Sequence, residues 1–392
     1  MNDAVIVDAV RSPMGKGRPG GALSGLHAVE LLGQTLTGLF GRLDVDPGQV
    51  DDVIVGCVTQ VGEQSSVGRY GWLAAGFPEH VPAVTVDRKC GSGQQAVHFA
   101  AQGVIAGTYD IAVAAGVESM SRIRMLSNVL GMHTTGPSVD ARYAPGLVHQ
   151  GIAAERAAAR WKLSREQLDA LSAESHRRAH QCALAGGFTR EIVPVTTPDG
   201  TVVTTDESIR PDTTPEKLAG LKPAFEDADL AARFPEINWS ITAGNSSQIT
   251  DGGSAVLIMS AAKASELGLR PRARIHTMTV VGDDPVAMLT APIPATRRAL
   301  ARSGLRLDEI DHYEVNEAFA PVPLAWQAEF DADPARLNPR GGAIAMGHPL
   351  GASGCRLLTT MLGALEDTGG RYGLQTMCEA GGMANTTIIE RL

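Results

Sequence analysis

The chain has few cysteines, no metal-binding motif and no long apolar run. Its five cysteines, at positions 57, 90, 182, 355 and 378, form an odd and unpatterned set among 392 residues. Without a Cys-x-x-Cys or His-Glu-x-x-His motif, the sequence indicates free thiols in a reducing cytoplasm and no metal or permanently bound cofactor. No stretch of about 18 apolar residues marks a membrane span, and the first residues show no targeting segment. We therefore expect a cytoplasmic protein.

Positive charge is in the minority. The chain has 34 Lys and Arg against 43 Asp and Glu, a net charge of −9, which argues against a general nucleic-acid surface. Hydrophobic residues make up 44% of the chain, and the 44 glycines indicate tight turns and close backbone packing. This composition and length predict a globular protein with a large core or two to three domains.

Short β-branched strands alternate with helical patterns over the first 120 residues. Strands are predicted at 4–8, 53–55, 81–87 and 111–115, and helices at 23–43, near 68–75 and at 96–106. This alternation predicts an α/β fold with a mainly parallel sheet covered by helices.

The pattern changes between about residues 121 and 244. Ala-rich helices are expected at 152–161 and 166–185, and a hairpin-like piece at 195–205, so this region is predicted to be an inserted subdomain. Strands return at 255–259 and 274–281. We accordingly place an N-terminal half at 1–120, an inserted loop domain at 121–247, the return of the first half at 248–270 and a C-terminal half at 271–392.

The two ends of the chain look like rough copies of each other. Residues 43–46 lead into a strand at 50–55, as 305–311 lead into one at 312–315. Cys90-Gly-Ser-Gly opens a helix in the first half, and the Gly-rich stretch 347–354 opens one in the second. An internal duplication would place these two helix starts symmetrically in one cleft.

Cys90 follows a predicted strand and precedes a predicted helix. Gly91 and Gly93 would let the backbone bend there. The helix start and the neighbouring Arg88 and Lys89 favour a thiolate, so the position suits a nucleophile. The alternative is a buried, inert cysteine.

Three further stretches carry chemical groups. Asn316 follows a predicted strand, where it can orient a water or cap a helix. His348 lies in a Gly-rich turn that would expose it, and it is either catalytic or structural. Cys378 follows a strand-like segment and, taken alone, is a packing residue.

Taken together and in order, Cys90-Gly-Ser-Gly, Asn316-Glu-Ala-Phe, Gly347-His348-Pro and the Cys378 motif resemble the thiolase family over nearly the whole chain. The resemblance implies a duplicated five-layer α-β-α-β-α fold with a loop domain inserted in the first half. It also implies CoA-dependent cleavage of a 3-ketoacyl-CoA, or the reverse condensation, with coenzyme A as co-substrate.

The resemblance assigns a role to each of these residues. Cys90 would carry the acyl group, His348 would take its proton, and Cys378 would protonate the departing acetyl-CoA carbanion. Asn316 would hold a water of one oxyanion hole, and the backbone N–H groups of Cys90 and Ala380 would form a second. The positions implied for substrate and CoA binding are His149, Lys222, Ala243, Ser247, Met288, Ala318 and Phe319.

The chain departs from the family pattern in two places. Ala380 replaces the first Gly of Cys-x-Gly-Gly-Gly, which would strain a positive φ. Gln150 follows His149 where acetoacetyl-specific members have Met, which favours a degradative 3-ketoacyl-CoA thiolase. The stretches 56–60 and 246–252 are similar to those of actinobacterial thiolases that act on bulky, steroid-derived chains.

Other functions remain open. A biosynthetic acetyl-CoA acetyltransferase would use the same residues, and a ketoacyl synthase would share the fold but lack the Cys378 and Asn316 motifs. A non-catalytic acyl-CoA-binding protein is the alternative from a different class. Thiolases are dimers or dimer-based tetramers, so the resemblance implies a homodimer or homotetramer.

Overall fold

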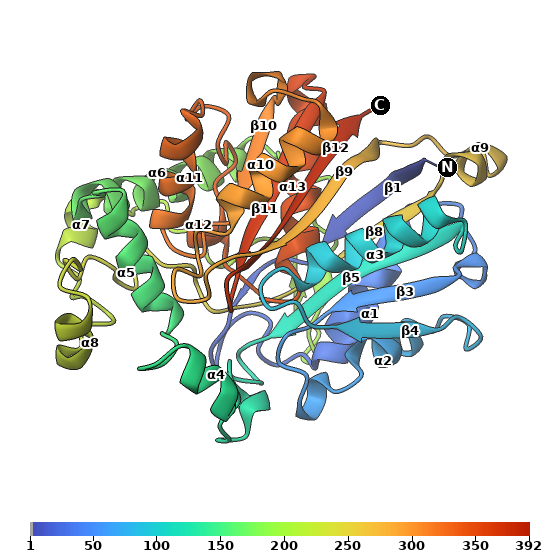
Figure 1. Ribbon diagram of the computed structural model, residues 1–392. Helices are drawn as coiled ribbons and strands as arrows, with labels where there is room; N and C mark the ends of the chain where they lie inside the picture. The colour runs from blue at the N-terminus through green and yellow to red at the C-terminus, as the bar shows by residue number, and fades with distance from the viewer. Residues whose placement is uncertain (1–2) are drawn as a thin grey trace.

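The computed structural model describes residues 3–392, and its largest feature is a ten-stranded sheet with helices on both faces (Figure 1). Met1 and Asn2, at the head of the expected N-terminal half, lie outside the described residues. The strands are β1 (Ala4–Arg11), β2 (Gly15–Lys16), β3 (Asp52–Gly56), β4 (Ala83–Val86), β5 (Ile111–Ser119), β6 (Val195–Thr196), β7 (Val202–Val203), β8 (Thr250–Ser260), β9 (Ala273–Gly282), β10 (His312–Val315), β11 (Tyr372–Glu379) and β12 (Met383–Arg391).

The predicted helices are present with shifted ends, and they lie among thirteen α-helices in the described residues. The thirteen are α1 (Ala28–Phe40), α2 (Val67–Ala74), α3 (Ser92–Ala106), α4 (Pro137–Arg142), α5 (Gln150–Arg160), α6 (Arg165–Leu184), α7 (Pro215–Ala219), α8 (Ala228–Arg233), α9 (Ala261–Glu266), α10 (Pro292–Ser303), α11 (Pro321–Phe330), α12 (Ala343–Met346) and α13 (Ser353–Thr368). The first helix starts five residues later than predicted, because the His27 ring caps it by accepting from the Val29 N–H.

The main sheet repeats one pairing pattern twice. In the first half, β3 is parallel to β5, which is antiparallel to β8, which is antiparallel to β1. In the second half, β10, β11, β12 and β9 repeat the same three relations in the same order. This repetition supports the predicted duplication.

The sheet is mixed, so the expectation of a mainly parallel sheet was wrong. Only β3–β4, β3–β5 and β10–β11 are parallel among the described strand pairs. The reason is that each half ends with strands that return beside its central strand: β8 comes back after the insertion, and β12 follows β11 in a hairpin.

Alternating residues of the strands separate the cores. Val53 and Val55 pack with α1 and α2, whereas Ile54 faces the opposite core with α3 and α13. The second-half strands face α10 and α11 through another core that contains Leu374 and Ile388. Helices, sheet, paired helices, sheet and helices therefore form the five predicted layers.

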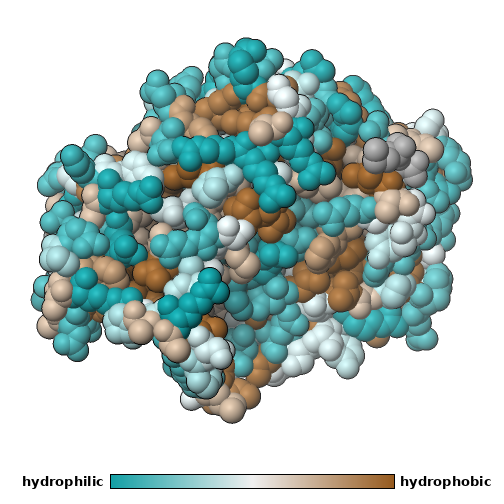
Figure 2. Space-filling model, viewed as in Figure 1, coloured by the Kyte–Doolittle hydropathy of each residue, from teal (hydrophilic) through white to brown (hydrophobic). Residues whose placement is uncertain are grey.

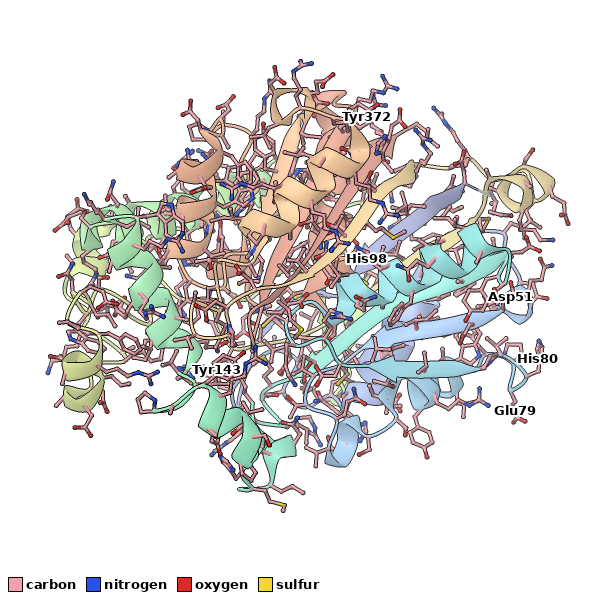
Figure 3. The ribbon with its side chains drawn as sticks, in the orientation of Figure 1. Asp51, Glu79, His80, His98, Tyr143 and Tyr372 are labelled. Atoms are coloured by element: carbon pink, nitrogen blue, oxygen red, sulfur yellow. The ribbon has the colours of Figure 1, made fainter. Side chains whose placement is uncertain are left out.

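The middle layer joins the two halves. His98 on α3 lies beside the second-half strands in Figure 3, and its Nε2 is 2.8 Å from the Thr387 hydroxyl of β12. Directly between the half-sheets, β1 and β9 share only the pairs Val5–Arg274 and Ile6–Ala273. Helix packing is therefore the broader connection between the halves.

The segment between β5 and β8 lies to one side of the sheet, away from the β4 edge (Figure 1). It contains α4 to α8 and the predicted hairpin, β6–β7. Buried charged groups tie it to the core: the Arg11 guanidinium contacts Glu191 at 2.6 Å and Asp206 at 2.7 Å. No helix in residues 3–392 has the length and apolar character needed to cross a membrane.

Candidate active site

Cys90 lies at the end of a tight turn that leads from β4 into α3. The bend falls on Lys89, whose φ is +48°, and not on the two glycines that follow. Gly91 and Gly93 are needed for close approach instead. A Cβ on Gly91 would lie 1.9 Å from a Glu379 carboxyl oxygen, and one on Gly93 would lie 2.7 Å from the Gly351 carbonyl oxygen.

The two helix starts meet backbone to backbone. A Cβ on Gly354 at the start of α13 would lie 1.9 Å from the Gln94 nitrogen at the start of α3. The Cys355 thiol lies 3.3 Å from the Gly93 carbonyl oxygen. The structure therefore brings the Cys90 turn and the His348 turn together, as the duplication predicts.

The Cys90 side chain is a thiol in the resting protein. Burial, followed by the nearby Glu379 carboxyl, raises the pKa of Cys90 to about 12. The thiol form of Cys90 is therefore strongly favoured over the thiolate at neutral pH. The expectation of a preformed thiolate was wrong, because burial outweighs the helix start and Lys89 is paired with Asp87 at 2.7 Å.

Two backbone N–H groups nevertheless favour an anion at this position. The N–H groups of Cys90 and Ala380 interact with the Cys90 sulfur and act to lower the pKa of its thiol. They are the pair that the family resemblance implies for an oxyanion hole, and their convergence provides a place where negative charge is stabilised.

Ala380 is not strained. It is absent from the described residues with positive φ, whereas Gly381 and Gly382 have φ of +88° and +77°. The concern that Ala380 distorts the hole was wrong, because the two glycines that remain take the left-handed backbone conformation.

His348 is buried, so the prediction that its turn exposes it was wrong. Gly347, with φ of +99°, packs against Thr250, and the His348 N–H donates to the Gln248 carbonyl oxygen at 3.0 Å. This tight backbone contact turns the imidazole inward.

Ser353 assigns the tautomer of His348. The Ser353 hydroxyl donates to the Pro349 carbonyl oxygen at 2.8 Å, so it accepts from His348 Nδ1 at 2.6 Å. His348 Nε2 therefore carries the free lone pair. Burial and the Arg356 guanidinium lower the pKa of His348 to about 3, which keeps the ring neutral.

Asn316 lies beside this lone pair. Its Nδ2 is 3.5 Å from His348 Nε2, and its Oδ1 has no hydrogen-bond partner in residues 3–392. The helix-cap alternative is excluded, since Ala320 occupies the N-cap of α11. A buried amide with a free oxygen is suited to hold a water or a substrate oxygen.

Cys378, near the end of β11, is also buried. Burial, followed by Cys90 and Glu379, raises the pKa of Cys378 well above the usual thiol value. One cysteine comes from each half of the chain, as expected.

Glu118 fixes the backbone segments that surround these residues. Its carboxyl accepts from the N–H groups of Val58, Thr59 and Gly351 at 3.0, 2.9 and 2.9 Å. Gly351 lies three residues after His348, so Glu118 links the His348 turn to the first half. Sequence reasoning missed Glu118 and Ser353, because neither forms a motif without its distant partners.

Five of the seven positions expected to bind CoA contact one another or a common neighbour. Met288, Ala318 and Phe319 share one core cluster with Cys378, and the Ser247 N–H donates to the Ala318 carbonyl oxygen at 3.0 Å. The His149 and Phe319 rings both flank Phe225, at centroid distances of 5.4 and 6.1 Å. Phe225 is a contact that the sequence analysis missed.

The other two positions lie on the surface. Lys222 and Ala243 are exposed, on segments joined by the Ala224–Ile241 backbone hydrogen bond of 2.8 Å. Lys222 takes part in no ion pair between described residues, whereas Lys217 nearby is paired with Asp212 at 2.7 Å. The Lys222 ammonium group is therefore available to an anionic ligand.

Comparison with known proteins agrees with this architecture. Residues 4–262 match the family model for the thiolase N-terminal domain, and residues 269–391 match that for the thiolase C-terminal domain. The fold and the family models together define an acyltransferase of the thiolase class. The chain belongs to the thiolase family.

Individual relatives cover the whole chain. It is 50% identical to the steroid 3-ketoacyl-CoA thiolase FadA6 of Mycobacterium tuberculosis, over 100% of this chain and 95% of that protein. It is 43% identical to a 3-ketoacyl-CoA thiolase of Saccharophagus degradans, over 100% and 98%. The crystal structure of the Bacillus anthracis acetyl-CoA acetyltransferase is similar with a TM-score of 0.89 and 35% identity, over 100% and 99%.

Proposed function

We propose that this chain cleaves 3-ketoacyl-CoA with coenzyme A, giving acetyl-CoA and a shortened acyl-CoA through an acyl-Cys90 intermediate. The observation that carries this proposal is the packing of the Cys90 turn against the end of the Cys378 strand and against the His348 turn: Gly91 lies against Glu379, and Gly93 lies against Gly351. The curated relatives named above as 3-ketoacyl-CoA thiolases support the same reaction.

In the first step, Cys90 attacks the 3-keto carbon. Its proton passes to His348 Nε2, the nitrogen that the Ser353 contact leaves unprotonated. The C2–C3 bond then breaks, and the acyl group stays on the Cys90 sulfur. Asn316 supports this step by holding a water against an oxyanion.

In the second step, Cys378 donates its proton to the acetyl-CoA carbanion. A thiol whose pKa lies well above its usual value is protonated at neutral pH and is therefore ready to act as an acid. Incoming CoA then gives its thiol proton to the Cys378 thiolate and takes the acyl group from Cys90 as a new thioester. The departing Cys90 thiolate regains its proton from His348. The N–H groups of Cys90 and Ala380 stabilise the developing oxyanion.

We assign the CoA contacts to His149, Lys222, Ala243, Ser247, Met288, Ala318 and Phe319. The apolar members and the His149–Phe225–Phe319 row suit the pantetheine chain, and the unpaired Lys222 ammonium suits a phosphate. CoA is a co-substrate here, and the reaction as written needs no resident cofactor.

Substrate size is tested with a series of 3-ketoacyl-CoA esters, from acetoacetyl to long and steroid-like chains. We expect turnover to rise with chain bulk, in line with the steroid thiolase that shares half of its residues with this chain. Turnover confined to acetoacetyl-CoA would instead favour an acetyl-CoA acetyltransferase, the activity named for the Bacillus anthracis structure.

Two variants test the roles of the cysteines. We expect Cys90→Ser to abolish acyl transfer, and Cys378→Ala to accept an acyl group on Cys90 but to lose cleavage and condensation. Intact-protein mass spectrometry separates the two outcomes. Near-normal turnover of Cys90→Ser would contradict the mechanism, and CoA binding without turnover in the wild type would support a non-catalytic acyl-CoA-binding protein.

We also propose the chain division 1–120, 121–247, 248–270 and 271–392. It is supported by the positions of β5 and β8, which pair with each other although the inserted segment separates them in sequence. We propose a cytoplasmic location, in keeping with five cysteines that are all free.

We propose that the chain forms a homodimer through β4 and α3. Strand β4 is an edge of the sheet, and Val84 and Phe99 are 45% and 42% exposed there. Figure 2 shows apolar surface gathered over this region. A second apolar group, Leu126, Leu130 and Met132 in the inserted segment, would serve for assembly into a tetramer.

Light scattering after size exclusion tests this assembly. We expect Phe99→Glu to yield monomers, because a charge at an apolar contact opposes association. Leu184→Lys, at a site 75% exposed on α6, is the matched control and should keep the wild-type mass. A dimer that survives Phe99→Glu would place the interface elsewhere.

A further inference from the structure

Glu379 is a buried carboxyl that packs on the turn after Cys90 and directly follows Cys378 in sequence. It lies at the end of β11 and is completely shielded from solvent. Its Oε1 lies 1.9 Å from the place where a Cβ of Gly91 would be, so the side chain packs directly on the residue after Cys90. The carboxyl therefore bridges the Cys90 turn and the Cys378 strand.

The surroundings do not neutralise a charge at this position. Neither carboxylate oxygen receives a hydrogen bond within residues 3–392, although the Asn385 N–H and the Arg88 guanidinium favour the charged form. Arg88 is not positioned as an ion-pair partner, since its Nε has no hydrogen-bond partner in the same stretch of chain. A buried carboxyl without such partners is more stable when protonated.

The titratable groups that face Glu379 are few. The Cys90 turn contributes Asp87, Arg88 and Cys90, with Lys89 bound to Asp87, and β11 contributes Cys378. On β12, neither Met383, which pairs with Glu379, nor Asn385, whose backbone N–H acts on the carboxyl, titrates. Burial, opposed by Arg88 and reinforced by Asp87, raises the pKa of Glu379 to about 8.

We propose that Glu379 is a positioning residue that must be protonated for the reaction, because its ionised form places a negative charge beside both thiols and opposes their activation. This inference rests on the proposed thiolase function, since it assigns the same two cysteines. Geometry gives the reason: one carboxyl touches the Cys90 turn and is bonded in sequence to Cys378. A negative Glu379 raises the pKa of either thiol.

The proposal has a defined pH dependence. Below about pH 8 Glu379 is neutral. The Cys90 thiolate population should therefore be the same in Glu379→Gln as in the wild type. Above that pH the wild-type carboxyl ionises and disfavours the Cys90 thiolate, whereas the Gln variant stays neutral. The difference between the two proteins should therefore appear only on the alkaline side.

The test is the rate at which iodoacetamide alkylates Cys90, followed by peptide mass spectrometry from pH 6.5 to 9.5. We expect the ratio of rates, Glu379→Gln over wild type, to rise from about one to about ten, because one pKa unit changes the thiolate population about tenfold. Glu266→Gln, an exposed carboxyl on α9, is the control and should keep a ratio of one throughout. A ratio for Glu379→Gln that does not change with pH overturns the proposal.

Two features keep the result interpretable. Alkylation needs no turnover, so it separates failure of this inference from failure of the proposed function. If Glu379→Gln does not fold, the wild type alone supplies the test: the logarithm of its Cys90 alkylation rate should rise by less than one unit per pH unit above pH 8. A slope of one up to pH 9.5 would also overturn the proposal.

Discussion

The residues around Cys90 create a site that is neutral at rest. The Cys90 and Cys378 thiols are protonated, and the His348 ring is uncharged, in each case chiefly because of burial. Isolated charges are costly in such an environment. Charge therefore develops only when a substrate supplies the carbonyl oxygen that the Cys90 and Ala380 N–H groups can stabilise.

The relaxed backbone of Ala380 leads to a prediction at this scale. We expect Ala380→Gly to leave turnover no higher than in the wild type, because there is no strain to relieve. It should lower the free energy of unfolding by about 0.5–1 kcal/mol, since glycine adds freedom to the unfolded chain. Steady-state kinetics and urea unfolding measure both effects.

Gly381→Ala is the matched comparison. Its φ is +88°, and a Cβ there would meet no atom within 4 Å, so the backbone conformation alone should cost about 1–2 kcal/mol. A gain in turnover for Ala380→Gly would show that Ala380 limits the oxyanion hole after all.

At the scale of elements, the contact between the starts of α3 and α13 determines the geometry of the site. Gly354 approaches the Gln94 backbone so closely that no side chain fits. Gly354 also follows Ser353, which orients the His348 ring. Any shift of α13 relative to α3 therefore moves His348 relative to Cys90.

We expect Gly354→Ala to destabilise the fold by about 3 kcal/mol and to reduce turnover strongly, because two backbones must separate to admit the methyl group. Urea unfolding and the thiolysis assay measure the two effects. Gly25→Ala, whose new methyl would lie 3.9 Å from the nearest atom in Pro198, is the control and should be close to neutral. Unchanged stability of Gly354→Ala would refute the close contact.

Most of the elements, and the order of the site motifs, were predictable from sequence. Short β-branched runs predicted β1, β3, β4 and β5 correctly, and the repeat of turn and helix-start patterns predicted the duplication. These signals are local or repeat along the chain. The mixed sheet was missed because strand direction depends on the return of β8 after more than a hundred residues.

The electrostatics of the site were not predictable in the same way. The positive charges next to Cys90 in sequence suggested a thiolate, but Lys89 turns to Asp87, and the group that faces Cys90 is Glu379 from the other half. Burial of His348 likewise depends on Thr250 and Gln248, about a hundred residues away. Such effects arise only when distant segments meet.

At the scale of the whole molecule, the two halves share a core. Ala96 and Val97 of α3 pack in one cluster with Leu358 and Met361 of α13, between the half-sheets. Unfolding one half would expose the core of the other, so the halves are expected to unfold together.

Two single-tryptophan variants test this cooperativity. Trp72 lies buried in the first half and Trp326 in the second, and each variant keeps one of them and replaces the other tryptophans by Phe. In each variant we expect tryptophan fluorescence and far-UV circular dichroism to report the same urea midpoint. Separate midpoints would mean that the halves are independent folding units.

Glu118 and Cys378 occupy the same place in the two repeats. Each lies two residues beyond the last parallel pair of its strand, Gly56–Gly116 in the first half and Val315–Thr376 in the second. Glu118 binds three backbone N–H groups and holds the frame, whereas Cys378 faces Cys90. The repeats thus divide labour at equivalent positions. If the two halves were made identical in sequence, the fold could remain. The protein would nevertheless lose either the Glu118 carboxyl that binds three backbone N–H groups or the Cys378 thiol that donates a proton.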